Sequence, residues 1–546
     1  AQRGRERGGW MAGGRSIAPR LLVRIRRRLQ SQRCRAQASQ AAAPRYLQSA
    51  LHRELALLAR EGARDPGDVL AAFWRHCELF APDVTDLDAC LNAVVGCRPR
   101  STPEHGRHLL RLLECLERIV MRDLQLDREA SRCLSASSWA LARLAKQRPQ
   151  PPAEFLARLP ATFATLEAAA QPWLGECFLP RNLAIMAWSF AKAGAGSPAF
   201  FRALGDAALG RSEQLEPREI SNLCWAFATV KMRHKLLTQM ASRLAASGSR
   251  VERFSEQDLS TCAWALATLQ VGDHALFGRL AAAAEARSGE LSVPGVVNLA
   301  WALAAVGAPG GGFVPRALDR ISSGRRWEEF EPRGCARLLW ALAKMRRDDA
   351  GAELFFLSLA DRYIVPRAQL FHSQDTANSL WAFATSRFLH QATFAALAQR
   401  AVQIIQSFNP QALANTVWSC ARMRVPAPGL FAAAEALALE RQMRGWPPHS
   451  IATLCWACAE SGQRPLALLP PLAAELAARA GAFNDVDLAT LAAVLGPEGG
   501  WPAELRATRR AALARIAGEG RRRSLPHTRE ALAAAELVAR VDPDAS

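Results

Sequence analysis

The sequence predicts an all-α protein, an α-solenoid of stacked helical hairpins with about 37–41 residues per repeat. Three observations support this fold class: a tryptophan-centred motif recurs along the chain, the apolar residues around it have a helical period, and proline recurs at the expected helix starts. A fixed period of roughly 20 to 50 residues is the signature of a repeat architecture. Hairpins of this length bury their apolar faces only by stacking on their neighbours.

The repeat tryptophans define the register of the motif, and positions are counted from them, so that position −3 lies three residues before the tryptophan. They are Trp139, Trp188, Trp225, Trp264, Trp301, Trp340, Trp381, Trp418 and Trp456, and subtraction gives spacings of 49, 37, 39, 37, 39, 41, 37 and 38. Leucine, alanine and cysteine surround each tryptophan at helical spacing. We therefore expect the indole rings in the core, where bases cannot stack on them.

Each repeat is expected to contain two helices. Proline at position −8 marks the start of the first helix, because the missing N–H of proline is harmless in a first helical turn. The prolines are Pro180, Pro217, Pro332, Pro410 and Pro448. Alanine at positions +1 and +3 leaves room for a second helix, which follows a break and is visible in 236–246 and 394–405.

The chain divides into four predicted segments: 1–45, a basic segment; 46–130, a helical region with a degenerate leading repeat; 131–496, the tryptophan repeats; and 497–546, a short basic helical tail. Asn92 takes the tryptophan position in the leading repeat, and Ala493 takes it in a closing repeat. Terminal repeats of this kind cap a stack. In the tail we expect helices at 503–517 and 528–541, separated by a basic loop at Arg521–Arg523.

The net charge of +19 has two sources, since residues 1–45 hold twelve arginines against one acid and so contribute +11, which leaves +8 for the rest. Arg-rich, acid-poor sequence resembles a transit peptide and predicts import into a chloroplast or mitochondrion. A basic arm that contacts nucleic acid without being cleaved is the alternative. No run of 18 apolar residues occurs, so we expect no membrane span.

Neither the cysteines nor any catalytic motif indicates an enzyme or a cofactor. Cys224, Cys262, Cys420, Cys455 and Cys458 fall at packing positions next to repeat tryptophans, and the CxxC at 455–458 has no second pair at zinc spacing. We expect them to be small buried hydrophobic residues in a reducing compartment. The chain has no phosphate-binding glycine loop, no HExxH and no nucleophile elbow.

Positions −7, −3 and +4 share one face of the first helix and carry amides, hydroxyls and cations, whereas most other positions are apolar. An amide can pair with a base edge and a cation with phosphate, so one such set per repeat predicts recognition of single-stranded RNA. The candidate RNA-binding residues are Arg181, Lys192, Arg218, Asn222, Thr261, Asn298, Arg333, Arg337, Lys344, Gln374, Asn378, Gln411, Asn415 and Arg422. Alternatively, the asparagines tie neighbouring repeats together and the cations form an ordinary solvated face.

The motif resembles the octotricopeptide repeat, in which proline, glutamine, leucine, alanine and asparagine precede tryptophan-alanine-x-alanine. The resemblance is carried by FNPQALANTVWSCARM at 408–423, EPREISNLCWAFATVKM at 216–232 and SQDTANSLWAFATS at 373–386. The heptatricopeptide repeat is similar, and the spacing does not separate the two. The resemblance implies an organellar RNA-binding protein that acts in transcript stability, processing, splicing or translation. Many members carry a C-terminal RAP domain, but no strand pattern follows Gly496.

The expected function is therefore sequence-selective binding of single-stranded organellar mRNA or rRNA, over roughly eight to ten nucleotides if one repeat contacts one base. RNA-processing or ribosomal proteins are expected as further partners. Two alternatives stay open: an armadillo-like scaffold whose asparagine ladder holds an extended peptide, and a structural component of an organellar ribosome.

Overall fold

The computed structural model describes residues 54–55, 66–77, 82–97, 103–122, 127–246, 251–287, 289–346, 349–462, 465–496 and 501–523. Within these ranges every regular element is helical, as the sequence predicts. The basic segment 1–45 and the expected helix at 528–541 lie outside the described residues. The chain forms two compact units, unit 1 over residues 1–204 and unit 2 over residues 205–546, and each is described by itself.

Unit 1 contains the first helices of three hairpins packed side by side. The helices α4 (Val84–Gly96), α6 (Arg128–Leu144) and α8 (Pro180–Ala193) contact one another in chain order, and α5 (Pro103–Arg122) packs on α7 (Ala153–Ala170). The unit also contains α3 (Pro66–Cys77), the 3-10 turn η1 (Gln171–Trp173) and the beginning of α9 (Pro198–Leu209). Because α4 lies beside α6, it occupies the place of a first helix, as expected for a degenerate leading repeat.

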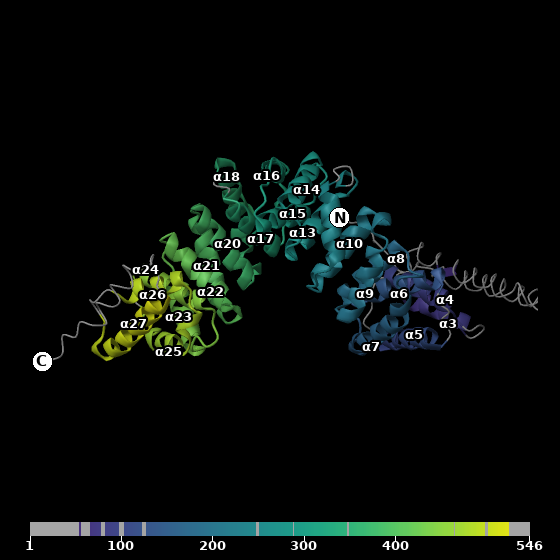
Figure 1. Cartoon of the computed structure of the whole chain (residues 1–546), viewed down its shortest axis with the longest axis horizontal. Coiled ribbons are helices and arrows are strands. Elements are labelled where there is room, and N and C mark those ends of the chain that lie inside the picture. Colours follow the sequence, from purple (N-terminus) through teal and green to yellow (C-terminus); the bar gives the residue numbers. More distant parts are fainter. Residues whose placement is uncertain are drawn as a thin grey trace, which may run out of the picture. The chain divides into compact units, whose positions relative to one another are not determined.

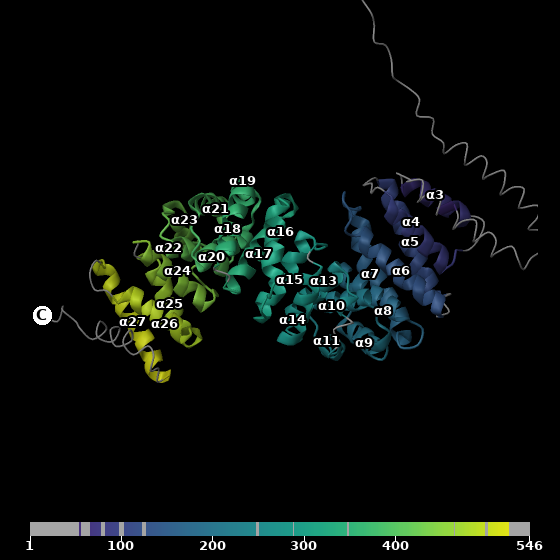
Figure 2. The same ribbon diagram turned by 90° about the horizontal axis from the view of Figure 1, so that it is seen from above.

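Unit 2 is an α-solenoid in which each first helix packs on the next along the chain (Figure 1 and Figure 2). The first helices are α10 (Pro217–Thr229), α13 (Glu256–Thr268), α15 (Val293–Val306), α17 (Pro332–Lys344), α20 (Ser373–Ser386), α22 (Pro410–Arg422), α24 (Pro448–Glu460) and α26 (Asp485–Leu495). The five predicted proline starts are confirmed, because α8, α10, α17, α22 and α24 each begin at one.

The second helices form a separate layer, and Figure 1 shows α14, α16 and α18 above α13, α15 and α17. They are α11 (Lys235–Ala246), α14 (His274–Ala286), α16 (Phe313–Ser323), α18 (Ala350–Leu359), α21 (Gln391–Gln403), α23 (Pro428–Glu440), α25 (Leu469–Arg479) and α27 (Ala503–Arg523). After α18 the chain continues through the π-helical turn η4 (Ala360–Ile364) and α19 (Val365–Arg367). Single 3-10 turns, η2 (Ser212–Gln214), η3 (Arg326–Glu329), η5 (Ala368–Leu370), η6 (Ile405–Ser407) and η7 (Ala480–Ala482), precede five of the first helices.

The first helices of unit 2 run parallel, with equivalent positions in contact. The rings of Trp340 and Trp381 are 6.4 Å apart between centroids, and Arg337 donates to Asn298 at the same motif position over 3.4 Å. The alanines at positions +1 and +3, such as Ala341 and Ala343, are buried and small enough for this close approach. Any residue type that recurs at one motif position therefore forms a row across the unit.

An arginine near the end of the second helix, or just after it, holds the backbone that precedes the first helix of the same repeat. Arg441 donates to the carbonyl oxygens of Phe408 at 2.8 Å and Gln406 at 2.9 Å. Equivalent bonds, with Tyr363 replacing arginine in one repeat, join Arg287 to Phe254, Arg320 to Leu291, Tyr363 to Phe330, Arg400 to Phe371, Arg479 to Trp446 and Arg523 to Phe483. We call these bonds the carbonyl clamps. The arginines that form these clamps therefore have a structural role.

The expected basic loop at Arg521–Arg523 is wrong, because these residues form the last turn of α27. Arg522 and Arg523 both donate to Glu519 on the preceding turn, which favours a continued helix. Arg523 also makes the last carbonyl clamp at 2.8 Å. The helix α27 packs on α25 and α26, and so occupies the place of a second helix in the closing repeat.

We expect Arg441→Met to lower the free energy of unfolding by about 2 kcal/mol, because two carbonyls lose a charged donor. Urea unfolding measures the change. Arg444→Met, at an exposed neighbouring site, is the matched control and should change stability by less than about 0.5 kcal/mol. Equal effects of the two substitutions would show that the clamp does not stabilise the repeat.

Candidate nucleic-acid interface

The repeat tryptophans are partly exposed, so the expectation that they lie in the core is wrong. All nine are intermediate in burial, whereas the apolar residues at position −10, including Phe254 and Phe408, are buried. The reason lies in the helical period: positions −7, −3 and +4 are close to whole turns from the tryptophan itself. The face that carries the polar residues therefore also carries the indole rings.

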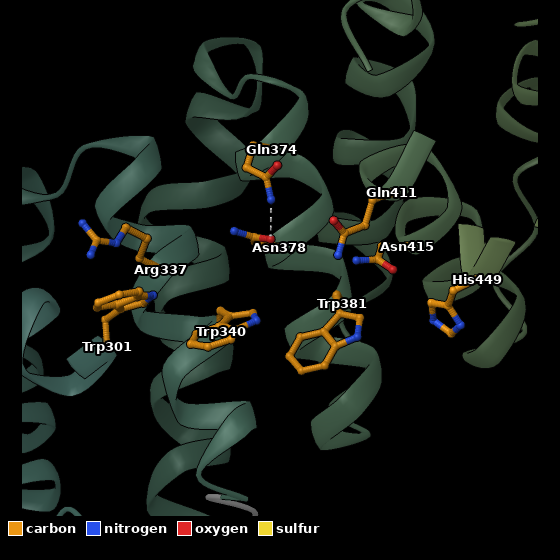
Figure 3. A pocket seen from close by; sticks show the side chains of 9 residues that line it. All are labelled: Trp301, Arg337, Trp340, Gln374, Asn378, Trp381, Gln411, Asn415 and His449. Carbon is orange, nitrogen blue, oxygen red and sulfur yellow. Dashed lines mark hydrogen bonds between the residues drawn. The ribbon is translucent and has the colours of Figure 1, made fainter. Parts of the chain in front are cut away.

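One groove gathers these residues in unit 2, with a volume of about 390 Å³ (Figure 3). Its lining comes from α15, α17, α20, α22 and α24, and consists of Trp301, Arg337, Trp340, Gln374, Asn378, Trp381, Gln411, Asn415 and His449. Five of these are predicted RNA-binding residues, at positions −7 and −3 of consecutive repeats. The three tryptophans and His449 complete the lining, and none of the nine side chains is acidic.

Of the four groove amides, Gln374 and Asn378 bond to each other along α20. This bond uses only part of the donors and acceptors that the amide side chains offer. Gln374 Nε2 donates to Asn378 Oδ1 at 2.9 Å, one turn away on α20 (Figure 3). Within the described ranges, no side-chain hydrogen bond links Asn222, Asn378 or Asn415 to a neighbouring repeat. The structural role proposed for the asparagines is therefore limited to Asn298, which accepts from Arg337.

Arg337 is the cation at the centre of the predicted stripe. Its guanidinium lies over the ring of Trp301, 5.0 Å from the centroid, and no acid pairs with it among the described residues. Partial burial, and then repulsion from Arg333, lower the pKa of Arg337. Arginine keeps its charge at neutral pH, so this site holds a partly desolvated positive charge that an anion would stabilise.

The other predicted residues are on the same kind of face but outside the groove. Arg218, Arg333, Lys344 and Arg422 are exposed, and no ion pair involves them in the part of the chain that is described. Asn222, Thr261 and Asn298 are partly buried on α10, α13 and α15 of unit 2. Arg181 and Lys192 are on α8 of unit 1.

Two buried acidic residues, Asp375 and Asp487, lie near the groove. His449 Nδ1 lies 2.9 Å from Asp487 Oδ1, and Asp487 is buried in the first turn of α26. On α20, Asp375 is buried and accepts from the backbone N–H of His372 at 3.3 Å, and its burial raises its pKa. The Asp375 carboxyl caps α20 and the Asp487 carboxyl pairs with His449, and neither acid is among the residues that line the groove.

The cysteines next to the repeat tryptophans are buried, as predicted. Burial raises the pKa of the Cys420 and Cys458 thiols to about 12, which keeps them protonated at neutral pH. Among the described residues, no group of three or more histidine, cysteine or acidic side chains is placed to hold a metal ion.

No family model matches the chain, and no curated protein matches its sequence. Among solved structures, it is similar to a homology model of the full-length AP-3 complex in an intermediate open conformation. The identity is 10%, the match covers 92% of this chain and 91% of that chain, and the TM-score of 0.28 is too low to inform function. No described helix has the length and apolar character needed to span a membrane.

We expect Asn378→Ala and Asn415→Ala each to change the free energy of unfolding by less than about 0.5 kcal/mol, because neither side chain bonds to another repeat. Leu380→Ala, on the same helix as Asn378, is the reference. Because Leu380 is fully buried, its replacement should lower the free energy of unfolding by about 2–5 kcal/mol. Thermal or urea unfolding of the three variants measures these changes in stability. Asparagine variants as unstable as the leucine variant would restore the structural role.

Proposed function

We propose that unit 2 binds single-stranded RNA on its tryptophan face, defined as the tryptophans and the residues at positions −7, −3 and +4 of its first helices. The observation that carries the proposal is the groove itself, in which three indole rings, four amides and Arg337 converge without an acidic side chain. This combination matches the chemistry of a nucleotide chain, which offers an aromatic base, polar base edges and a negative phosphate.

Each group has a distinct part in the proposed binding. Partly exposed indole rings offer surfaces on which bases of any sequence stack, at about 1–3 kcal/mol per base. Asn378 and Asn415 present amides that can donate to and accept from a base edge, which provides sequence preference. Arg333 and Lys344 are exposed cations that strengthen the attraction for a polyanionic strand.

The proposal favours a single strand because stacking on a side chain needs bases that are not already paired and stacked in a duplex. If one tryptophan repeat contacts one nucleotide, the repeats of unit 2 from Trp225 to Trp456 give a footprint of about seven nucleotides. The first helices would then set the path of the strand, because equivalent positions meet from repeat to repeat.

The resemblance to octotricopeptide repeats supports a role in organellar RNA metabolism, in transcript stability, processing, splicing or translation. The protein would act as a binding protein and not as an enzyme, in a chloroplast or mitochondrion. Crosslinking in the native organelle, followed by sequencing of the attached RNA, identifies the target. Recovery of only random cellular RNA would contradict a selective function.

An extended peptide is the second candidate ligand, since alternating tryptophans and asparagines can hold a peptide backbone and its apolar side-chain stems. The cations near the groove, which no ion pair engages within the described residues, favour a polyanion over a neutral or basic peptide. Competition between labelled RNA and peptide pools for the same protein separates the two candidates. Displacement of RNA by a neutral or basic peptide at lower concentration would favour the scaffold.

We expect Arg333, Arg337 and Lys344, replaced together by glutamine, to weaken binding to all RNA sequences alike. The slope of log K against log salt should become shallower by about 0.7 per lost phosphate contact. Fluorescence anisotropy over a salt series measures both quantities. The triple replacement of Arg279, Arg362 and Arg506 by glutamine removes the same charge at other exposed sites, and an equal loss there would reduce the effect to net charge.

The double replacement of Asn378 and Asn415 by alanine should change which sequence is preferred, because two adjacent repeats lose base-edge contacts. Selection from a random single-stranded RNA pool, with parent and variant side by side, gives the preferred sequences. The matched control replaces Thr229 and Thr385, exposed residues at position +4, and should keep the parent preference. Identical sequences selected by the parent and the asparagine variant would refute base reading by these amides.

A further inference from the structure

Every first helix of the tryptophan repeats in unit 2 ends on a left-handed residue at position +6. The φ angles there are positive: 54° at Lys231, 53° at Gln270, 69° at Gly307, 53° at Arg346, 60° at Arg387, 53° at Arg424 and 80° at Gly462. In the five repeats where the following residue is described, its N–H bonds back to a carbonyl five residues earlier, as from Met232 to Phe227 at 2.9 Å and from Val425 to Cys420 at 2.9 Å. This is the Schellman motif, which ends a helix with a left-handed residue and most often uses glycine there.

Four repeats place a long cation in this conformation, which disfavours any residue with a Cβ. Gly307 and Gly462 fill the same position in other repeats of the same unit, so the fold needs no side chain there. Steric preference therefore does not explain Lys231, Arg346, Arg387 and Arg424. A conformation kept against its intrinsic preference indicates a role for the side chain.

These four side chains are exposed, and no ion pair engages them within the described ranges. Lys344 and Arg422, at position +4 of two of the same helices, are also exposed and lie one turn or less away. We call these six residues the basic row. Of the described acids near these helix ends, Asp273 and Asp349 accept from backbone N–H groups as helix caps, and Glu460 is exposed on α24.

The basic row lies beside the tryptophans in the repeats of Trp225, Trp340, Trp381 and Trp418, and the last three of these repeats are consecutive. Neighbouring helix ends are in contact, because Arg233 Nη2 donates to the carbonyl of Gln270 at 2.6 Å and His274 Nε2 lies 3.0 Å from the carbonyl of Val306. Six residues at about 1.5 Å of rise each separate position +6 from the tryptophan, a distance of about 9 Å along the helix axis. The groove amides lie on the other side of the tryptophans, at positions −7 and −3.

We propose that the basic row is the phosphate track of the RNA site, so that bases stack on the tryptophans and face the amides while the sugar-phosphate backbone follows the C-terminal ends of the first helices. This inference rests on the proposed function and deepens it by fixing which edge of the tryptophan face the backbone follows. Phosphates then lie beside long flexible cations, and the amides meet the base edges.

The test replaces Lys231, Arg346, Arg387 and Arg424 by glycine, the residue that the same position already holds at Gly307 and Gly462. Because glycine relieves the left-handed conformation, the variant should fold with a melting temperature equal to or above that of the parent. The control replaces four other exposed arginines, Arg279, Arg362, Arg506 and Arg515, by glutamine and so removes the same charge. Both are compared with the parent on a labelled 12-nucleotide single-stranded RNA over a salt series.

If each lost cation contacts one phosphate, the slope of log K against log salt becomes shallower by about 0.7 per contact, and affinity at 0.1 M salt falls about 5-fold per contact. The control should retain nearly the parent slope. Equal slopes for the glycine variant and the control would overturn the phosphate track while RNA binding by the parent still stood. A parent that binds no RNA would instead contradict the proposed function.

A polyglutamate peptide of matched charge distinguishes RNA from an acidic protein as the occupant. The parent should bind it far more weakly than the RNA, because the peptide has no bases to stack on the tryptophans. Tighter binding of polyglutamate, lost in the glycine variant, would assign the basic row to an acidic protein partner and overturn the proposal.

Discussion

The parallel register of the first helices is the constraint on which the other features of unit 2 depend. Small residues at positions +1 and +3, such as Ala341 and Ala343, let neighbouring helices approach closely enough for equivalent positions to touch. Contacts between Trp340 and Trp381, and between Asn298 and Arg337, follow from this register. Exposed residues at the same motif position of successive first helices therefore lie next to one another and form a row.

Local signals in the sequence predicted the helices well, and contacts between repeats were harder to predict. The proline starts are correct because the constraint acts within one turn, and the groove amides were found because positions −7 and −3 share a helix face. The exposure of Trp301 was missed because apolar neighbours outweighed the helical period. The carbonyl clamps join residues 29 to 40 positions apart, which no local pattern reveals.

The positive charge of the protein has several physical origins, so the net value of +19 alone does not identify a ligand. Arg441 and Arg523 hold backbone carbonyls within the repeats. Arg346 and Arg424 keep unfavourable backbone conformations at exposed helix ends. Sorting cations by their contacts therefore separates those that maintain the stack from those available to a polyanion, which total charge cannot do.

Ultraviolet crosslinking of unit 2 within the full chain to single-stranded RNA, with the crosslinked peptides identified by mass spectrometry, tests the central claim most directly. Aromatic rings stacked on bases are well placed to crosslink, so the adducts should concentrate on the peptides that contain Trp301, Trp340 and Trp381. Adducts confined to the second helices, for example to α14, α16 and α21, would contradict RNA binding on the tryptophan face.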